Sequence, residues 1–552
     1  MSSVDCRSAQ KNVDGVLEGC NFAYMTKNAI EKYKNISKID KHNREETMLE
    51  KKTIRVDRDA QAVFYNSVDF CIGTGRMGLA LTQEYQEQLK LVQEEIGFSH
   101  IRGHGLFCDD MAIYQEYEEN GVKKVEYNYT YLDRVMDFYR SVGLRPFLEL
   151  GFMPEKLARG TQTIFYWKGN TTPPRDYNIW CEMVQSLLRH LMQRYGAEEV
   201  VKWPIEVWNE PNLSGFWENA DMQEYFRLFC ETFHAIKAVD ARFHVGGPAV
   251  CGGTDEVWIR AFLEYCREQK LAVDFVTRHH YTIEQPDCVG HYDYVKLIDP
   301  KEGFANLRTS REIVDSFAEY KNLPIHITEF NTSYTPKSVI HDTNLNAAFI
   351  AHQLSRLGDG NASYSYWTFG DLFEEQGVPF IPFHGGFGLV AEGCIPKPTF
   401  WTFVFYKKLQ ESDGACVYKD DNLVVLRKQN GDYLGVGWNP VEENIQQDKN
   451  IVLSLATNTG EYGLLIKTVD EETCNPLKVW HDLGEPANLT NAQKKLLRQA
   501  AQPFVQTNRL ESTDADIEIS LSLKRNAVVY FEVWKCDEKS DRGYDYKRAI
   551  WG

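Results

Sequence analysis

From residue 69 onward, short apolar runs alternate with longer amphipathic stretches. The longer stretches carry apolar residues at helical spacing and end near a glycine, as in residues 82–97 and 131–143. The short runs are typical of buried strands, and eight of them follow in this order: DFCIG (69–73), HIRGHG (100–105), RPFLELGF (145–152), PIEVWNEP (204–211), FHVGGPA (243–249), DFVTRHHYT (274–282), PIHITEFNT (324–332) and YSYWTFGDLF (364–373). Eight strands that alternate with helices predict an α/β fold, a (β/α)8 TIM barrel over residues 67–390.

A different pattern starts after residue 400, where alternating apolar and polar residues recur in short runs. In NLVVLRKQNGDYLGVGW (422–438), two such runs flank an Asn430-Gly431 pair, which is typical of a hairpin turn. Further runs, among them LKVWHDLG at 477–484, continue the pattern. We therefore predict an accessory all-β sandwich domain over residues 391–536.

Both ends of the chain are polar. Residues 1–52 form a Lys/Glu-rich extension to which no chemistry is assigned, and residues 537–552 form a C-terminal tail. Between the extension and the barrel, KKTIRVD (51–57) reads as a strand, so residues 53–66 are predicted to add a strand to the sandwich.

Composition narrows the classes of ligand and compartment. The 552 residues exceed one compact domain, and a hydrophobic content of 43% allows a large core. The net charge of −18, without a basic stripe, is opposite to what a nucleic-acid-binding surface needs, so no such partner is expected. Thirteen cysteines without CxxC pairs, together with a start that lacks an apolar signal core, predict a cytoplasmic protein. No stretch is apolar for long enough to span a bilayer.

Two acidic residues lie where barrel chemistry is expected, at the carboxyl ends of strands. Glu210 ends the fourth candidate strand and Glu329 the seventh, so the two face each other across the mouth of the barrel. Cleavage of a glycosidic bond needs an acid that protonates the leaving oxygen and a carboxylate near the anomeric carbon. Retaining enzymes hold the two carboxyl groups about 5–5.5 Å apart, and inverting enzymes leave about 6.5–9.5 Å for a water. Either residue alone has an ordinary structural reading, as a helix cap or the partner of an arginine.

The motifs around these acids resemble glycoside hydrolase family 39, most closely its bacterial β-xylosidases. The resemblance rests on WPIEVWNEPNL and HITEFNTSY and on an ordered series of further matches: GTGRMGLAL, IRGHGLFCDDM, ELGFMP, TPPRDY, VGGPA, DFVTRHHYT, YWTFGDLFEEQGVPFIPFHGGFGLV and PKPTF. It implies a barrel with a β-sandwich, retention of configuration and no cofactor. By the same resemblance Glu210 is the acid/base and Glu329 the nucleophile, and the protein forms a homo-oligomer, a tetramer by analogy.

The resemblance also assigns sugar contacts to polar and aromatic residues at the strand ends: His104, Asn209, His279, Tyr281, Tyr334, Trp367, Glu374, Glu375 and Phe165. Asn209 is expected to bind the 2-hydroxyl of the sugar, and Tyr281 to lie near the nucleophile. Because alternate strand residues share a face, His279 and Tyr281 point inward together while His280 points away.

Several of these positions have a second reading. His104 and Trp367 also fit a barrel core, and two adjacent acids such as Glu374 and Glu375 are often a solvated edge. A metal site is not expected, because HExxH is absent and adjacent strand residues such as His279 and His280 cannot chelate together. The HGGFG run at 384–388 is interpreted as a turn and not a phosphate loop, since no helix with a lysine follows it.

The resulting hypothesis is a retaining, exo-acting β-xylosidase that releases xylose from the non-reducing end of xylo-oligosaccharides or from aryl and alkyl xylosides. Another glycosidase of the same family, such as an α-L-iduronidase-like enzyme, is an alternative. Its substrate carboxylate needs a cation, for which Arg102 and Arg278 are the main candidates at strand ends, although their neighbours mark both as structural. A further alternative is a carbohydrate-binding barrel without catalysis.

Overall fold

The computed structural model describes residues 50–514, 516–537 and 545–550. The predicted extension at 1–52 lies outside the described residues except for its last three positions. The predicted tail is described at 537 and 545–550, where a short helix, α13 (Tyr546–Ala549), is present.

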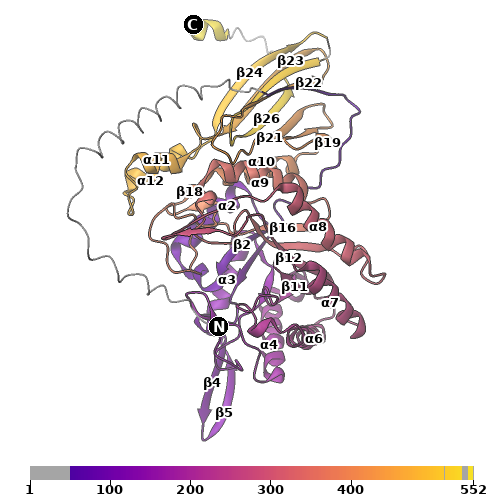
Figure 1. Cartoon of the computed structure of the whole chain (residues 1–552), viewed down its shortest axis with the longest axis vertical. Coiled ribbons are helices and arrows are strands. Elements are labelled where there is room, and N and C mark those ends of the chain that lie inside the picture. Colours follow the sequence, from indigo (N-terminus) through magenta and orange to yellow (C-terminus); the bar gives the residue numbers. More distant parts are fainter. Residues whose placement is uncertain (1–49, 515, 538–544, 551–552) are drawn as a thin grey trace, which may run out of the picture. The chain divides into compact units, whose positions relative to one another are not determined.

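A parallel sheet of nine strand segments forms the first part of the fold, with helices around it (Figure 1). The segments are β2 (Cys71–Arg76), β3 (His100–His104), β6 (Arg145–Pro146), β7 (Leu148–Leu150), β10 (Ile205–Val207), β11 (Val245–Val250), β12 (Phe275–Tyr281), β15 (Ile325–Asn331) and β16 (Ser363–Tyr366). Their order in the sheet is β6-β3-β2-β16-β15-β12-β11-β10-β7.

The two edges of this order belong to one broken strand, which closes the sheet into a ring. β6 and β7 are separated only by Phe147, whose amide donates to the carbonyl of Ile101 in β3. The next amide, that of Leu148, donates to Pro204 O beside β10. Successive amides of a strand point to opposite sides, so this one segment bonds both neighbours. The ring is TIM-like, as the alternating pattern predicts.

Helices connect these strands and bury their apolar faces against the ring. They are α2 (Gln83–Glu95), α3 (Thr130–Ser141), α4 (Tyr177–Tyr195), α5 (Ala197–Val200), α6 (Met222–Val239), α7 (Asp255–Glu268), α8 (Pro300–Asp315), α9 (Asn344–Leu357) and α10 (Pro398–Glu411). Asp176, Asp221 and Asp299 accept hydrogen bonds from the first amides of α4, α6 and α8, caps that each contribute about 1 kcal/mol. No helix in the described ranges is long and apolar enough to cross a membrane.

Within the described residues, four 3-10 turns and four short hairpins fill the connections between the larger elements. The turns are η1 (Met77–Leu81), η2 (Asp109–Met111), η3 (Glu218–Ala220) and η4 (Val339–Asp342). The hairpins pair β4 (Tyr114–Glu119) with β5 (Val122–Tyr127), β8 (Thr163–Ile164) with β9 (Gly169–Asn170), β13 (Asp287–Val289) with β14 (Tyr292–Tyr294), and β17 (Val390–Ala391) with β18 (Ile395–Pro396).

Two further sheets follow in the C-terminal part of the chain. One has the order β19 (Ala415–Lys419), β20 (Leu423–Arg427), β21 (Tyr433–Trp438), β26 (Val528–Lys535), β23 (Gly460–Val469) and β24 (Phe504–Ser512). The other has the order β1 (Glu50–Val56), β22 (Lys449–Ala456) and β25 (Asp516–Leu523), with β1 parallel to β22. Alternate residues of β25, such as Ile519 and Leu521, are buried in one apolar cluster with Val425 and Phe531 of the larger sheet.

The predicted strand at 477–484 is wrong, because this segment forms helix α11 (Pro476–Asp482). Asn475 caps it by accepting from the amide of Lys478, and Pro476 occupies the first turn, where its missing amide costs nothing. Trp480 then packs in a small cluster with Leu497 of α12 (Asn491–Ala500). The Asn-Pro start is a helix signal that outweighs the short alternation of apolar residues.

Candidate active site

The backbone turns sharply where β10 ends, and this turn aims Glu210 at the mouth of the barrel. Trp208 and Glu210 have positive φ angles of 73° and 43°, a left-handed conformation that is uncommon outside glycine. Hydrogen bonds hold the turn: Trp208 Nε1 donates to Phe216 O (2.8 Å), and the amide of Glu210 donates to Ala249 O (3.0 Å). Strained backbone that its surroundings hold in this way is concentrated at functional sites.

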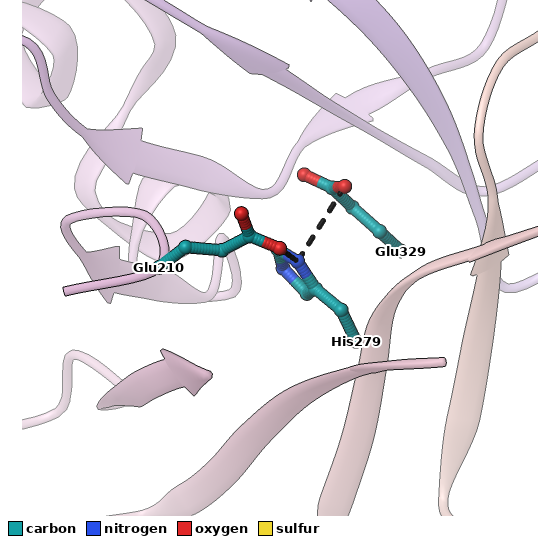
Figure 2. Close-up of side chains that lie close together, drawn as sticks. All are labelled: Glu210, His279 and Glu329. Atoms are coloured by element: carbon teal, nitrogen blue, oxygen red, sulfur yellow. Dashed lines mark hydrogen bonds and ion pairs between the residues drawn. The ribbon is translucent and has the colours of Figure 1, made fainter. Parts of the chain in front are cut away.

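Glu210 and Glu329 meet over His279 (Figure 2). His279 Nδ1 lies 2.7 Å from Oε1 of Glu210 and 3.5 Å from Oε2 of Glu329. One carboxylate oxygen of each glutamate and a ring nitrogen of His279 all lie within 4.8 Å of one another. The prediction that these two acids come close together is confirmed, although 119 residues separate them in the chain (329 − 210).

Glu329 is held by two donors, one on the neighbouring strand β12 and one on β3 across the ring. Arg102 Nη1 donates to Oε1 at 2.7 Å, and the hydroxyl of Tyr281 donates to Oε2 at 2.7 Å. Burial raises the pKa of Tyr281 well above its usual value, so this hydroxyl keeps its proton. A positive charge and a neutral donor together stabilise the carboxylate form and fix its orientation.

Arg102 bonds several residues of the site at once, and the sequence analysis did not predict its contact with Glu329. Its side chain is completely buried, and it also donates to Glu206 (2.6 Å) and to Oδ1 of Asn209 (2.8 Å) and lies 3.0 Å from Glu149. Arg102 therefore contacts the candidate nucleophile directly, besides its structural bonds. The signal was present, since residues 102 and 104 alternate on one strand and His104 was expected to face the site.

His104 lies between two further acids, Glu149 and Glu375, and the candidate nucleophile Glu329. Its Nδ1 lies 2.7 Å from Oε2 of Glu149, and its Nε2 lies 3.6 Å from Glu329 and 3.7 Å from Glu375. Burial opposes protonation of the ring, but the carboxylates, Glu149 first, outweigh it and raise the pKa of His104 to about 9. The ring is thus a buried cation at neutral pH and not a neutral core histidine.

The two adjacent acids at 374 and 375 take different directions. Glu375 lines the cavity, and burial raises its pKa well above the usual value. Glu374 instead accepts a hydrogen bond from Arg76, with 2.8 Å between Nη2 of Arg76 and Oε2 of Glu374. Of this pair, only Glu375 is brought to the other candidate residues.

Glu210 has the protonation behaviour of a general acid. Burial, with a smaller contribution from Glu149, raises its pKa to about 7, although His104 and Arg102 oppose the shift. Burial lowers the pKa of His279 to about 4, so this ring is neutral beside it. Desolvation is thus the largest cause of the upward pKa shift of Glu210.

A cavity of about 630 Å³ contains both carboxyl groups. Most of the predicted residues line it: His104, Asn209, Glu210, Tyr281, Glu329, Tyr334, Trp367 and Glu375. Tyr334 is half exposed at the rim, whereas Trp367 is buried in a cluster with Phe373 and Phe387. Phe165 is not among the residues that line the cavity; its ring stacks on the imidazole of His104, with 5.9 Å between the ring centroids. His280 bonds Gln353 (3.2 Å) but also borders this cavity, unlike the prediction that it points away from the site.

A larger cavity, of about 870 Å³, is lined mainly by residues of α8 and α9 and by none of the predicted site residues.

The spacing of Glu210, His279 and Glu329 would also suit a metal ion. The Arg102 guanidinium, 2.7 Å from Glu329, already supplies positive charge there and repels a divalent cation. The cluster therefore fits acid–base chemistry better than metal binding.

Two buried carboxyl groups at the strand ends of a barrel, one of them still protonated near neutral pH, define the site of a glycoside hydrolase. Comparison with known proteins agrees, because residues 52–518 match the family model of Glycosyl hydrolases family 39. The chain belongs to this family and is an enzyme.

Similar proteins match most of the length of this chain. A beta-xylosidase of Geobacillus stearothermophilus is 45% identical over 486 residues, 87% of this chain and 95% of that protein. A beta-xylosidase of Caldicellulosiruptor saccharolyticus is 34% identical over 443 residues, 78% of this chain and 88% of that protein. Among solved structures, a monomeric beta-xylosidase from Caulobacter crescentus CB15 is 33% identical, with a TM-score of 0.79, 88% of this chain covered and 100% of that one.

Proposed function

We propose that this enzyme is a retaining, exo-acting β-xylosidase that releases xylose from the non-reducing end of short xylo-oligosaccharides. The observation that carries the proposal is the spacing of the two acids, whose nearest oxygens lie within 4.8 Å. That spacing suits direct attack by one carboxylate, for which about 5–5.5 Å between the carboxyl groups is usual, and leaves too little room for an intervening water. The xylose specificity follows the two relatives named beta-xylosidase.

In the first step, Oε2 or Oε1 of Glu329 attacks the anomeric carbon while Glu210 gives its proton to the departing glycosidic oxygen. The bond to the leaving group breaks with its electron pair, and an ester joins the sugar to Glu329. In the second step, Glu210, now a carboxylate, takes a proton from water as the water oxygen attacks the same carbon. The ester bond breaks, Glu329 is restored as a carboxylate, and Glu210 is protonated again.

The buried polar groups around the acids suit a bound pentose. Oδ1 of Asn209 accepts from Arg102, which turns its amide nitrogen toward the cavity as a donor for the sugar 2-hydroxyl. His104 as a cation and Glu375 as a protonated or anionic acceptor supply two further hydrogen-bonding groups. Trp367 gives an apolar surface for one face of the ring.

One wall of the cavity is consistent with exo action. The amide of Tyr166, next to Phe165, donates to the carbonyl of Glu375 at 2.8 Å. This bond joins the loop after the third strand to the loop after the eighth beside Glu375, and we infer that the joined loops close the cavity on that side. A substrate chain would then extend only past Glu210, where the leaving group is protonated, and a single terminal sugar would occupy the closed end.

An iduronidase-like activity is less well supported by the two arginines. Arg102 is occupied by Glu149, Glu206 and Glu329. Arg278 is occupied by Asp255 (3.2 Å) and by the hydroxyl of Ser310 (2.6 Å). Neither guanidinium is free to bind a substrate carboxylate.

The decisive experiment is trapping with an activated 2-fluoro-xyloside followed by peptide mapping. A 2-fluoro-xylosyl ester on Glu329 is expected, and it would identify sugar, nucleophile and retention together. Parallel assays with aryl xyloside, aryl glucoside and aryl iduronide measure specificity. Turnover of the iduronide alone, or a label elsewhere, would contradict the proposal.

Three accompanying features belong to the same proposal. The two C-terminal sheets are proposed to form an accessory β-sandwich domain that begins after α10, near residue 412, and includes β1. A reducing compartment such as the cytoplasm suits the free cysteines, since every cysteine in the described ranges is unpaired. Assembly into a tetramer stays a prediction, to be measured by light scattering.

A further inference from the structure

A buried ion cluster outside the cavity has no part in the steps above. Lys397 precedes α10, and its side chain is completely buried. Its Nζ lies 2.6 Å from Oδ1 of Asp342 and 2.7 Å from Oδ2 of Asp371, and it donates to Gly386 O at 2.8 Å. A lysine is rarely fully buried, and here two carboxylates and a carbonyl complete its bonding.

The two aspartates of this cluster also accept hydrogen bonds from backbone amides of the HGGFG turn at 384–388. The amide of Gly388 donates to Oδ1 of Asp371 (2.7 Å), and the amide of Gly385 donates to Oδ2 of Asp342 (2.8 Å). A Cβ atom on Gly386 would lie 2.5 Å from Asp371 Oδ1, closer than real Cβ contacts come. The glycines of this motif are thus required because the backbone wraps directly around the two aspartates.

The segment between these anchors carries Glu375 into the active site. It leaves the barrel at Asp371 and returns at Gly385, and Phe387 just beyond it lines the cavity with Glu375. The nearest ionic partner of the Glu375 carboxylate, His104 Nε2, is 3.7 Å away, which is too far for a hydrogen bond. The anchors at the two ends of the segment, together with the Tyr166 amide that donates to the carbonyl of Glu375, therefore hold this residue through its backbone and not through a side-chain bond.

We propose that Lys397, Asp342 and Asp371 form a positioning cluster that sets the place of Glu375 and so controls the binding of the terminal sugar. The inference rests on the proposed function in one respect, that Glu375 contacts the substrate. Lys397 itself touches no substrate and acts only through the loop. Loss of the cluster is expected to loosen the loop while both catalytic acids keep their partners, Arg102, Tyr281 and His279.

A double-mutant cycle on the full-length enzyme tests this coupling. Lys397→Met, Glu375→Gln and the double variant are assayed for kcat and KM on an aryl xyloside. We expect Lys397→Met to lower kcat/KM roughly 10-fold or more, mainly through KM, in the otherwise unchanged enzyme. In the Glu375→Gln background the same change is expected to cost less than about 3-fold, because the group that it positions is already lost.

Equal fold-losses in both backgrounds would show a merely structural role and overturn the inference, as would a Glu375→Gln variant with unchanged kcat/KM. Lys407→Met is the matched control, because Lys407 is in α10 and pairs with Asp69 at 2.5 Å, away from the cavity. Asp371→Asn, which keeps the side-chain shape, repeats the cycle if Lys397→Met does not fold. If the wild-type enzyme cleaves a different glycoside, the cycle is run with that one, so the proposed function fails while the positioning inference is still tested.

Discussion

The hydroxyl of Tyr281 donates a 2.7 Å hydrogen bond to Oε2 of Glu329 on the adjacent strand. β12 and β15 pair in parallel, so the register that places His279 beside Glu329 also brings Tyr281 up to the same carboxylate. Sheet pairing thereby orients Glu329, the proposed nucleophile, without any flexible element.

Removal of this hydroxyl is expected to slow the reaction without unfolding the enzyme. A hydrogen bond to a charged group contributes about 1.5–3 kcal/mol, so Tyr281→Phe should lower kcat/KM about 10- to 100-fold. Steady-state kinetics on an aryl xyloside measures the effect. Tyr320→Phe is the control, since its hydroxyl bonds only the carbonyl of Leu271 (3.1 Å), and its kcat/KM should stay within about 2-fold.

The roles of the two acids are separable by the stereochemistry of azide rescue. Glu329→Ala should lose at least about 10³-fold in kcat. With azide and an activated aryl β-xyloside it should form the α-xylosyl azide, because azide then replaces the missing nucleophile with a single inversion. Glu210→Ala should give the β-azide, because azide attacks the intermediate on Glu329. Product NMR distinguishes the two, and an exchange of these outcomes would reverse the assignment.

The raised pKa of Glu210, about 7, predicts the alkaline limb of the pH profile. The acid must be protonated when the leaving oxygen departs, so kcat/KM should be full below this value and fall as pH rises through about 7. In Glu210→Ala, assayed with a leaving group that needs no proton, this limb should disappear. A limb that stays at the same pH would assign it to another group.

His104 should make the folded protein less stable as pH rises, whereas a paired carboxylate loses its stabilising effect as pH falls. Its folded pKa, about 9, lies above the ordinary value of 6.5. The contribution to stability is therefore fully present below pH 6.5 and is lost as pH rises through about 9. Thermal unfolding at pH 6 and pH 9 should show a larger fall in Tm for the wild type than for His104→Gln, whose side chain does not titrate in this interval. Equal falls would show that the ring is neutral.

Local pattern was sufficient to locate the barrel strands and the two acids. Short apolar runs between longer amphipathic stretches marked these strands, because the parallel strands of a barrel are buried on both faces. Glu210 and Glu329 were found because each lies toward the carboxyl end of such a run, where barrel chemistry is expected. The alternation also placed His279 and Tyr281 inward, where they bond Glu210 and Glu329, whereas His280, expected outward, bonds Gln353 and also borders the cavity.

The sequence could not predict which residues bond one another across the ring of strands. Arg102 bonds Glu206 and Glu329, residues more than one hundred positions away, and nothing in HIRGHG indicates which acids it meets. Glu375 enters the cavity while Glu374 binds Arg76, a choice made by loop geometry that two identical neighbours cannot encode locally. The sequence alone determined which residues could do the chemistry, because residue type and strand period are local properties. Tertiary structure decided their partners and protonation, because both depend on ring closure and on burial, which arise only when distant segments pack together.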